Sequence, residues 1–188
     1  GARPCAFAMQ GEAFKFLSLS TLNRSDIEFA QSHLLIISGL YGLLRPCDLI
    51  MPYRLEMGLT FKVDHNASSL YSFWSKQLQE PLSNKLNELK TDIILNLASD
   101  EYSTVIKRTG INARIITCTF KEESTKGFKS ISTYAKQARG AIARFAIQEN
   151  LSGEDGLKKL KSFNNLDYSF NSELSKPNNI IFTRFINK

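Results

Sequence analysis

The stretch from Leu34 to Gly58, LLIISGLYGLLRPCDLIMPYRLEMG, constrains the fold of this 188-residue chain more than any other. It places three glycines, two prolines and two arginines close together, and it carries charged side chains between apolar neighbours. Glycine reaches backbone conformations that other residues avoid, and proline fixes its own φ angle, so this stretch requires an unusual backbone. We therefore expect a tight turn here, with the rest of the chain packed around it.

The composition predicts a globular protein with a substantial core, because 43% of the residues are hydrophobic and 22% are charged. No apolar run approaches the ~20 residues that span a bilayer, so we expect no membrane partner. The N-terminus shows no signal-peptide pattern, which favours a cytoplasmic protein. Three scattered cysteines and two histidines match no disulfide framework or metal-ligand spacing, so we expect neither a metal site nor a cofactor.

Helical and extended patterns follow each other along the chain without an internal repeat. The expected strands are 5–8, 53–61, 92–98, 113–120, 128–132, 167–170 and 180–186. The expected helices are 12–19, one starting at Ser25, one from Ser68 or Ser69 that kinks or restarts at Pro81, 99–106, 134–150 and 154–163. Residues 34–38 fit either a helix or a buried strand. This order predicts a mixed α/β (α+β) class, with one compact domain over residues 1–188 and a largely buried mixed sheet surrounded by helices.

The turn between Ser38 and Gly42 is the first candidate binding site. Consecutive backbone N–H groups in a glycine turn can hold a phosphate, and Arg45 would lie next to it. The Gly-hydrophobic-x-Gly pattern after a helix loosely resembles a helix-hairpin-helix, a motif that binds the DNA backbone. The alternative is a structural turn closed by Pro46.

Three carboxylates are candidates for acid–base chemistry. Glu56 lies two residues from Arg54 on one face of an expected strand, so it is either a general base beside an anion clamp or half of an ion pair. Asp100 and Glu101 open a helix after a buried strand. Acids are ordinary in a first helical turn, but at a strand's carboxyl end they could also do acid–base work or hold magnesium.

The helix expected over residues 134–150 carries the clearest basic face. Projection at 100° per residue places Lys136, Arg139 and Arg144 on one side, with Gly140 and Ala143 between them. A low strip flanked by cations suits a sugar–phosphate backbone, and a solvated helix face is the alternative. This helix ends a basic run. The run comprises Lys107, Arg108, Arg114, Lys121, Lys126, Lys129, Lys136, Arg139 and Arg144, opposed only by Glu122 and Glu123.

Three blocks of sequence strongly resemble the YaaA family, the peroxide stress resistance proteins. They are SGLYGLLRPCDLIMPYRLEMG (38–58), NLASDEY (96–102) and YAKQARGAIARF (134–145), and their order and spacing match as well. The resemblance implies a cytosolic bacterial protein that protects against hydrogen peroxide and is linked to limiting free intracellular iron. It also implies an unusual α/β fold with a helix-hairpin-helix element that binds DNA. Family members begin with an apolar strand and a Ser-Pro-Ala-Lys-type turn, so we expect this chain to lack that opening section.

Two functions remain open from the sequence. The first is a protein that binds duplex or structured DNA, helped by the net charge of +6. Its candidate phosphate-binding residues are Gly39, Tyr41, Gly42, Arg45, Arg54, Lys136, Arg139 and Arg144. The second is an enzyme acting on a nucleotide or modified nucleobase in an Arg- and Lys-lined pocket. Its candidate catalytic residues are Glu56, Asp100 and Glu101.

Overall fold

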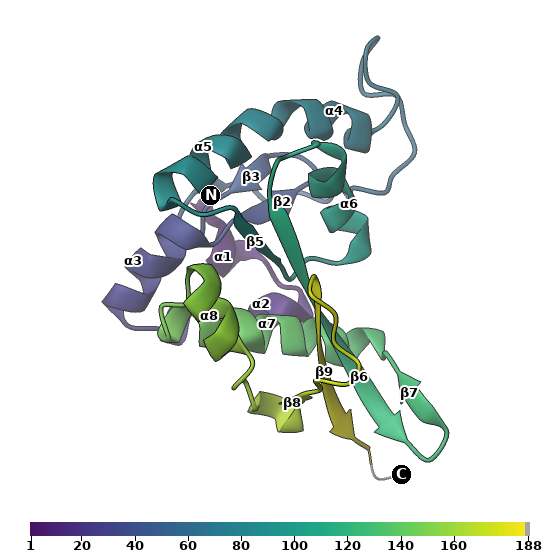
Figure 1. The fold of residues 1–188 in the computed structure, drawn as a ribbon. Helices are drawn as coiled ribbons and strands as arrows, with labels where there is room; N and C mark the ends of the chain where they lie inside the picture. Colours follow the sequence, from purple (N-terminus) through teal and green to yellow (C-terminus); the bar gives the residue numbers. More distant parts are fainter. Residues whose placement is uncertain (187–188) are drawn as a thin grey trace. The chain divides into compact units, whose positions relative to one another are not determined.

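The computed structural model describes residues 1–186, and the chain forms two compact units. Unit 1 comprises Gly1–Ala8, Ala30–Asp92 and Ala98–Ala113, and unit 2 comprises Met9–Phe29, Ile93–Leu97 and Arg114–Lys188. Both units mix helices with strands (Figure 1), which confirms the mixed α/β class. Within residues 1–186, none of the helices has the length and apolarity needed to cross a lipid bilayer.

Unit 2 is built on a five-stranded mixed sheet in the order β5-β6-β9-β8, with β7 paired to β6 off this path. Its strands are β5 (Ile93–Asn96), β6 (Arg114–Ser124), β7 (Gly127–Lys129), β8 (Ser169–Phe170) and β9 (Asn179–Phe185). β5 and β9 run parallel to β6, whereas β7 is antiparallel to β6 and β8 is antiparallel to β9. Burial alternates along β6, as expected where one face of a sheet packs on a core.

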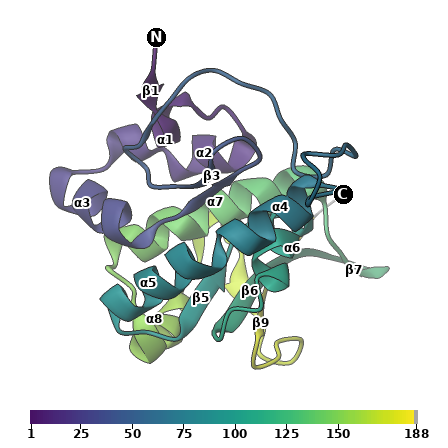
Figure 2. The ribbon, with the colours of Figure 1, turned by 90° about the horizontal axis from the view of Figure 1, so that it is seen from above.

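The helices of unit 2 form layers on this sheet. They are α2 (Glu12–Leu17), the 3₁₀ turn η1 (Leu19–Thr21), α7 (Ser132–Gln148), α8 (Gly153–Leu160) and the 3₁₀ turn η2 (Asn165–Asp167). α7 packs on β6, and α2 packs on α7, as Figure 2 shows. The core lies between sheet and helices. It comprises Ile116, Cys118, Phe120, Ala135, Ala138, Ala141, Ile142, Leu160, Phe163, Tyr168, Ile180 and Phe182.

Unit 1 contains two small antiparallel sheets and a set of helices. β1 (Arg3–Pro4) pairs with β4 (Leu49–Ile50), and β2 (Ile36–Ser38) pairs with β3 (Gly42–Leu44). Its helices are α1 (Cys5–Ala8), α4 (Leu70–Gln77), α5 (Gln79–Leu89) and α6 (Asp100–Arg108). α3 (Arg24–His33) passes from unit 2 into unit 1 at Ala30. Ser69 caps α4, as predicted, and the structure shows that Ser72 completes a capping box with it.

Three local predictions are wrong. Residues 5–8 form the short helix α1 instead of a strand. α3 begins at Arg24 and not at Ser25, because the preceding residue Asn23 caps the helix: its Oδ1 accepts the Asp26 N–H at 2.9 Å. Residues 53–61 form a loop instead of a strand, and the Gly58 N–H in this segment donates to the Glu101 side chain.

The helix-hairpin-helix prediction is also wrong at the glycine turn. The turn joins the antiparallel strands β2 and β3, with Ser38 paired to Gly42. α3 ends at His33, and the chain is extended again by Ile36, so no helix enters the turn. In the apolar run 34–38, which fits either a helix or a strand by sequence, Ile36–Ser38 therefore form the strand β2.

Candidate nucleic-acid interface

Both glycines of the turn are required by packing. A Cβ atom on Gly39 would lie 2.5 Å from the carbonyl oxygen of Leu55. A Cβ atom on Gly42, whose φ is +75°, would lie 2.5 Å from the ring of Trp74. The indole Nε1 of Trp74 also donates to the Gly39 carbonyl at 2.8 Å. The close approach that these two glycines allow therefore brings the turn into contact with Leu55 and Trp74, within unit 1.

The backbone N–H groups of the turn have an internal acceptor. Leu40 N and Tyr41 N both donate to Ser38 Oγ, at 3.2 and 2.9 Å, and Ser38 Oγ is 2.6 Å from the Tyr53 hydroxyl. The Tyr41 ring meets the Tyr53 ring edge-on, with centroids 5.4 Å apart. Phosphate binding by Gly39, Tyr41 and Gly42 stays a prediction, and the internal bonds favour the structural alternative.

The two arginines of this stretch are both ion-paired. Arg45 Nη2 lies 3.0 Å from Asp48 Oδ1, and the Arg45 N–H donates to Asp48 Oδ2 at 2.7 Å. Burial opposes ionisation of Asp48, but these bonds outweigh it and lower the pKa of that carboxyl. Arg54 Nη2 lies 3.5 Å from Glu56 Oε1 with its side chain 91% exposed. This exposed pair favours the interpretation of Arg54 and Glu56 as an ordinary surface ion pair over that of an anion clamp beside a general base.

The carboxylates after β5 also have structural roles. Glu101 Oε1 accepts the Gly58 N–H at 2.9 Å and so holds the loop after β4. Burial, reinforced by the Glu101 charge, raises the pKa of Tyr102. Asp100 is exposed in the first turn of α6. Among the residues described, no three His, Cys, Asp or Glu side chains are grouped to hold a metal ion. Catalysis by Glu56, Asp100 or Glu101 stays a prediction.

The expected basic face of α7 is largely covered by α2. Gly140 is buried because α2 lies directly on it. Arg144 Nη1 donates to the carbonyl oxygens of Leu17 and Ser18, at 3.1 and 2.9 Å, and so satisfies the C-terminal end of α2. The low strip between the cations is therefore a helix-packing surface, and the expectation that it lies open to a nucleic acid is wrong.

Lys136 and Arg139 complete the predicted α7 set. Lys136 is exposed near Glu12 of α2, whose pKa is lowered by a hydrogen bond from Lys15, a bond from Gln137 and, less strongly, the charge of Lys136. Arg139 is half-buried. Lys136, Arg139 and Arg144 belong to unit 2, whereas Gly39, Tyr41, Gly42, Arg45 and Arg54 belong to unit 1.

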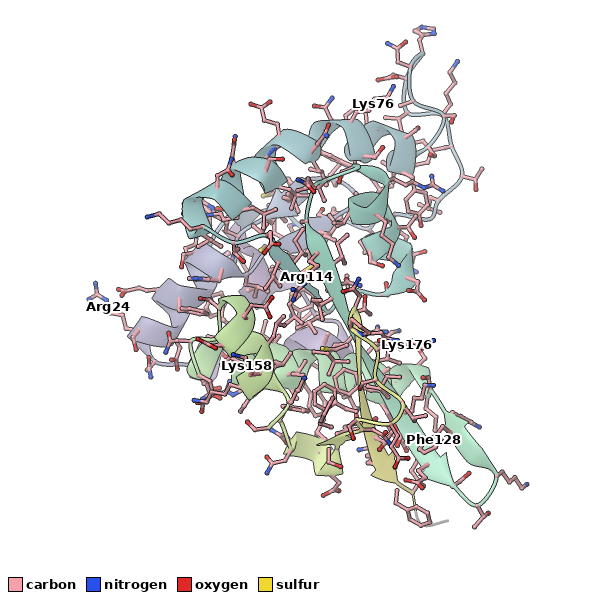
Figure 3. The ribbon with its side chains drawn as sticks, in the orientation of Figure 1. Arg24, Lys76, Arg114, Phe128, Lys158 and Lys176 are labelled. Atoms are coloured by element: carbon pink, nitrogen blue, oxygen red, sulfur yellow. The ribbon has the colours of Figure 1, made fainter. Side chains whose placement is uncertain are left out.

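A β-ribbon in unit 2 carries basic and aromatic side chains that sequence reasoning did not select. We define the ribbon as residues 122–129, in which Glu122 pairs with Lys129, Glu123 with Phe128 and Ser124 with Gly127. Both views show it projecting from its sheet (Figures 1 and 2). Lys126 and Lys129 are exposed, and Phe128 is 42% exposed (Figure 3).

The N-terminus of α7 follows the ribbon directly. Its N-cap residue is Ile131, whose side chain cannot accept a hydrogen bond, and its first turn contains no acidic residue. Ser132 and Thr133 are exposed there. A 17-residue helix has a positive N-terminal end with unsatisfied N–H groups, so this end favours an anion.

A buried ionic network anchors the base of the ribbon. Glu122 lies on the buried face of β6 and is only 4% exposed. Its Oε2 accepts a hydrogen bond from Arg184 Nε at 2.7 Å. Its Oε1 accepts from the Tyr168 hydroxyl. The Arg184 guanidinium lies over the rings of Tyr134 and Tyr168, 4.6 Å from each centroid. Tyr134 therefore packs on Arg184, and the network fixes where the ribbon leaves the sheet.

The charge of the chain concentrates in unit 2. This unit has 15 lysines and arginines against 10 aspartates and glutamates, a net charge of +5, whereas unit 1 has 9 against 8, a net charge of +1. Lys126 and Lys129 already stood in the basic run between Lys107 and Arg144. The sequence did not predict that β6 pairs with β7, and this pairing places Lys126 and Lys129 away from the core.

The fold and this surface define a mixed α/β protein with a projecting basic ribbon. A family model described as "Peroxide stress protein YaaA" matches residues 1–174. The chain is also 39% identical over 183 residues to a protein of Francisella philomiragia subsp. philomiragia named "UPF0246 protein", covering 97% of this chain and 70% of that relative. The chain therefore belongs to the peroxide stress protein YaaA family, which confirms the resemblance and supports a role in oxidative stress.

Proposed function

We propose that this protein binds DNA through the phosphate backbone as part of its role in peroxide stress. The binding surface is the basic ribbon surface, which comprises Lys126, Phe128, Lys129, the N-terminus of α7 at Ser132 and Thr133, and Lys136. The observation that carries the proposal is the acid-free N-terminus of α7 immediately after the exposed ribbon.

Charge and shape support this surface. Among the ion pairs between described residues, none involves Lys126, Lys129 or Lys136. Lysines of this kind release counterions when they neutralise phosphates, which drives binding without sequence preference. A two-stranded ribbon fits the major groove of B-DNA, and an exposed phenyl ring adds apolar contact to base edges. The proposed limitation of free iron stays a prediction of the family resemblance.

The test is fluorescence anisotropy with a labelled duplex at several salt concentrations. We compare wild type with the triple variant Lys126→Ala/Lys129→Ala/Lys136→Ala. We expect weaker binding by the variant. The slope of log affinity against log salt should become shallower by about 0.9 for each DNA phosphate that the variant no longer neutralises.

The matched control is Lys158→Ala/Lys159→Ala/Lys161→Ala, which removes the same charge from α8 and its C-cap. Figures 1 and 2 show α8 on the other side of unit 2 from the ribbon. Loss of binding in the ribbon variant alone supports the proposal. Equal losses in both variants, or no binding by wild type at low salt, would overturn it.

A further inference from the structure

A pocket of about 330 Å³ opens in unit 2, apart from the residues of the basic ribbon surface. It lies between the second half of α7 and the segment that follows α8. Its main lining residues are Arg144, Phe145, Gln148, Phe163, Asn164 and Asn165. This volume lies at the small end of the range of ligand sites, about 300–1,000 Å³, so the pocket suits a compact ligand.

The charge in this pocket is positive. Arg144 is the charged residue among those that line it, and its Nη1 is held by the carbonyls of Leu17 and Ser18. Both hydrogen bonds that Arg144 makes within the described residues come from Nη1, so its Nε and Nη2 donors remain available to a ligand. A guanidinium already fixed in place loses little side-chain entropy when it binds an anion, and its planar fork matches phosphate oxygens.

Asn165 adds a second donor. Its Oδ1 accepts the Leu166 N–H at 2.7 Å, which leaves its Nδ2 group as the hydrogen-bonding end that a ligand can use. The backbone here is specialised, because Leu166 has a φ of +57° and Asp167 a φ of +64°. Arg144 and Asn165 therefore offer donors, and donors select a ligand with anionic oxygens.

The remaining lining residues suit a flat heterocycle. Phe145 is half-buried, and its ring is held edge-to-face by the buried Phe163, with centroids 5.7 Å apart. Gln148 and Asn164 are exposed amides, each with donor and acceptor groups. Aromatic rings stack on nucleobases, and Asn and Gln amides pair with base edges.

We propose that this pocket binds a nucleoside 5′-monophosphate group. The phosphate lies at Arg144 and Asn165, and the base lies against Phe145 within reach of Gln148 and Asn164. Two sources share this chemistry, a free mononucleotide and the phosphorylated end of a nucleic-acid strand. The site is separate from the basic ribbon surface, so either proposal can fail without the other.

The test is isothermal titration calorimetry of the full chain with AMP, GMP, CMP and UMP, beside adenosine and inorganic phosphate. We expect at least one monophosphate to bind, and adenosine and phosphate to bind at least about tenfold more weakly, a difference of about 1.4 kcal/mol. Gln148→Ala and Asn164→Ala should each weaken that binding. These side chains are exposed, so neither change should disturb folding, and Lys158→Ala is the control that should bind as wild type does.

Competition by a short oligonucleotide, with and without a 5′-phosphate, distinguishes the two sources. Displacement of the monophosphate only by the phosphorylated strand assigns the site to strand ends, and no displacement assigns it to free mononucleotides. The ribbon triple variant should bind monophosphates unchanged. Absence of binding by every monophosphate, or wild-type affinity in both Gln148→Ala and Asn164→Ala, would overturn the proposal.

Discussion

A Cβ atom on Gly140 would lie 2.0 Å from the carbonyl oxygen of Ala13, so α2 and α7 meet backbone to backbone at this point. Alanine normally stabilises a helix interior relative to glycine by roughly 0.5–1 kcal/mol. At this site the methyl group has no space, and overpacking of this kind costs about 1–3 kcal/mol. We therefore expect Gly140→Ala to lower the free energy of unfolding, measured by urea denaturation.

Gly11→Ala is the control for that change. Gly11 is the N-cap of α2 with an ordinary φ of −66°, and its nearest neighbour to an added Cβ is 3.8 Å away. Alanine is a poorer N-cap than glycine but lowers the entropy of the unfolded chain, so these two effects oppose each other and the net change in stability should stay below about 1 kcal/mol. A Gly140→Ala protein as stable as wild type would show that α2 is not fixed on α7.

Arg144 should contribute to stability through α2. Its guanidinium donates to the Leu17 and Ser18 carbonyls, and the backbone of Ser18 has the left-handed conformation, with a φ of +45°. Hydrogen bonds from a charged group contribute about 1.5–3 kcal/mol to stability. Because the Arg144 side chain is only half-buried, we expect Arg144→Ala to lower the free energy of unfolding by about 2 kcal/mol. Lys136→Ala removes the same charge from an exposed position of α7 and should leave the urea midpoint nearly unchanged. Equal midpoints for the two variants would contradict this role.

The sequence predicts the long elements of this fold well. The helix expected over 134–150 matches α7 (Ser132–Gln148), and the capped helix with a break near Pro81 matches α4 and α5. Periodicity and capping are local, so neighbouring residues contain the information. The strand expected over 53–61 is a loop, and one of its backbone N–H groups, that of Gly58, donates to the side chain of Glu101, far along the chain.

The candidate site was harder to predict, because surfaces depend on distant segments. Gly140 and Arg144 indicate an open, basic strip when α7 is considered alone. The segment that covers this strip lies more than a hundred residues earlier, in α2. The ribbon presents the reverse case. Lys126 and Lys129 are ordinary members of a basic run until the pairing of β6 with β7 makes them exposed.

Tyr168 should make stability depend on pH in the alkaline range. Burial, and then its hydrogen bond to Glu122, raise the pKa of this hydroxyl above its ordinary value of 10.0. The folded state therefore holds the proton more tightly than the unfolded state does. This contribution is complete below about pH 10 and is lost as the pH rises toward the folded-state pKa.

Comparison with Tyr168→Phe isolates this effect. The buried thiols of Cys5 and Cys118 also have raised pKa values, but they titrate in both proteins alike. Urea midpoints between about pH 8 and pH 11 should fall more steeply for wild type than for Tyr168→Phe. Parallel pH profiles would contradict a tightly held proton at Tyr168.

The three cysteines should differ sharply in reactivity. Cys47 is exposed, whereas Cys5 and Cys118 are buried. Burial raises the pKa of Cys5 to about 11 and that of Cys118 to about 12, so neither forms much thiolate at neutral pH. The Cys5 Sγ also donates to the Arg45 carbonyl at 3.1 Å, which keeps this thiol within the fold.

Treatment of the native protein with a thiol reagent near pH 8 should modify one thiol quickly, and Cys47→Ser should abolish that fast phase while Cys118→Ser retains it. Unfolding in urea should then release the other two thiols, because their protection depends on the folded structure. A second fast thiol in the native protein would mean that unit 1 opens around Cys5, or unit 2 around Cys118, far more readily than their burial implies.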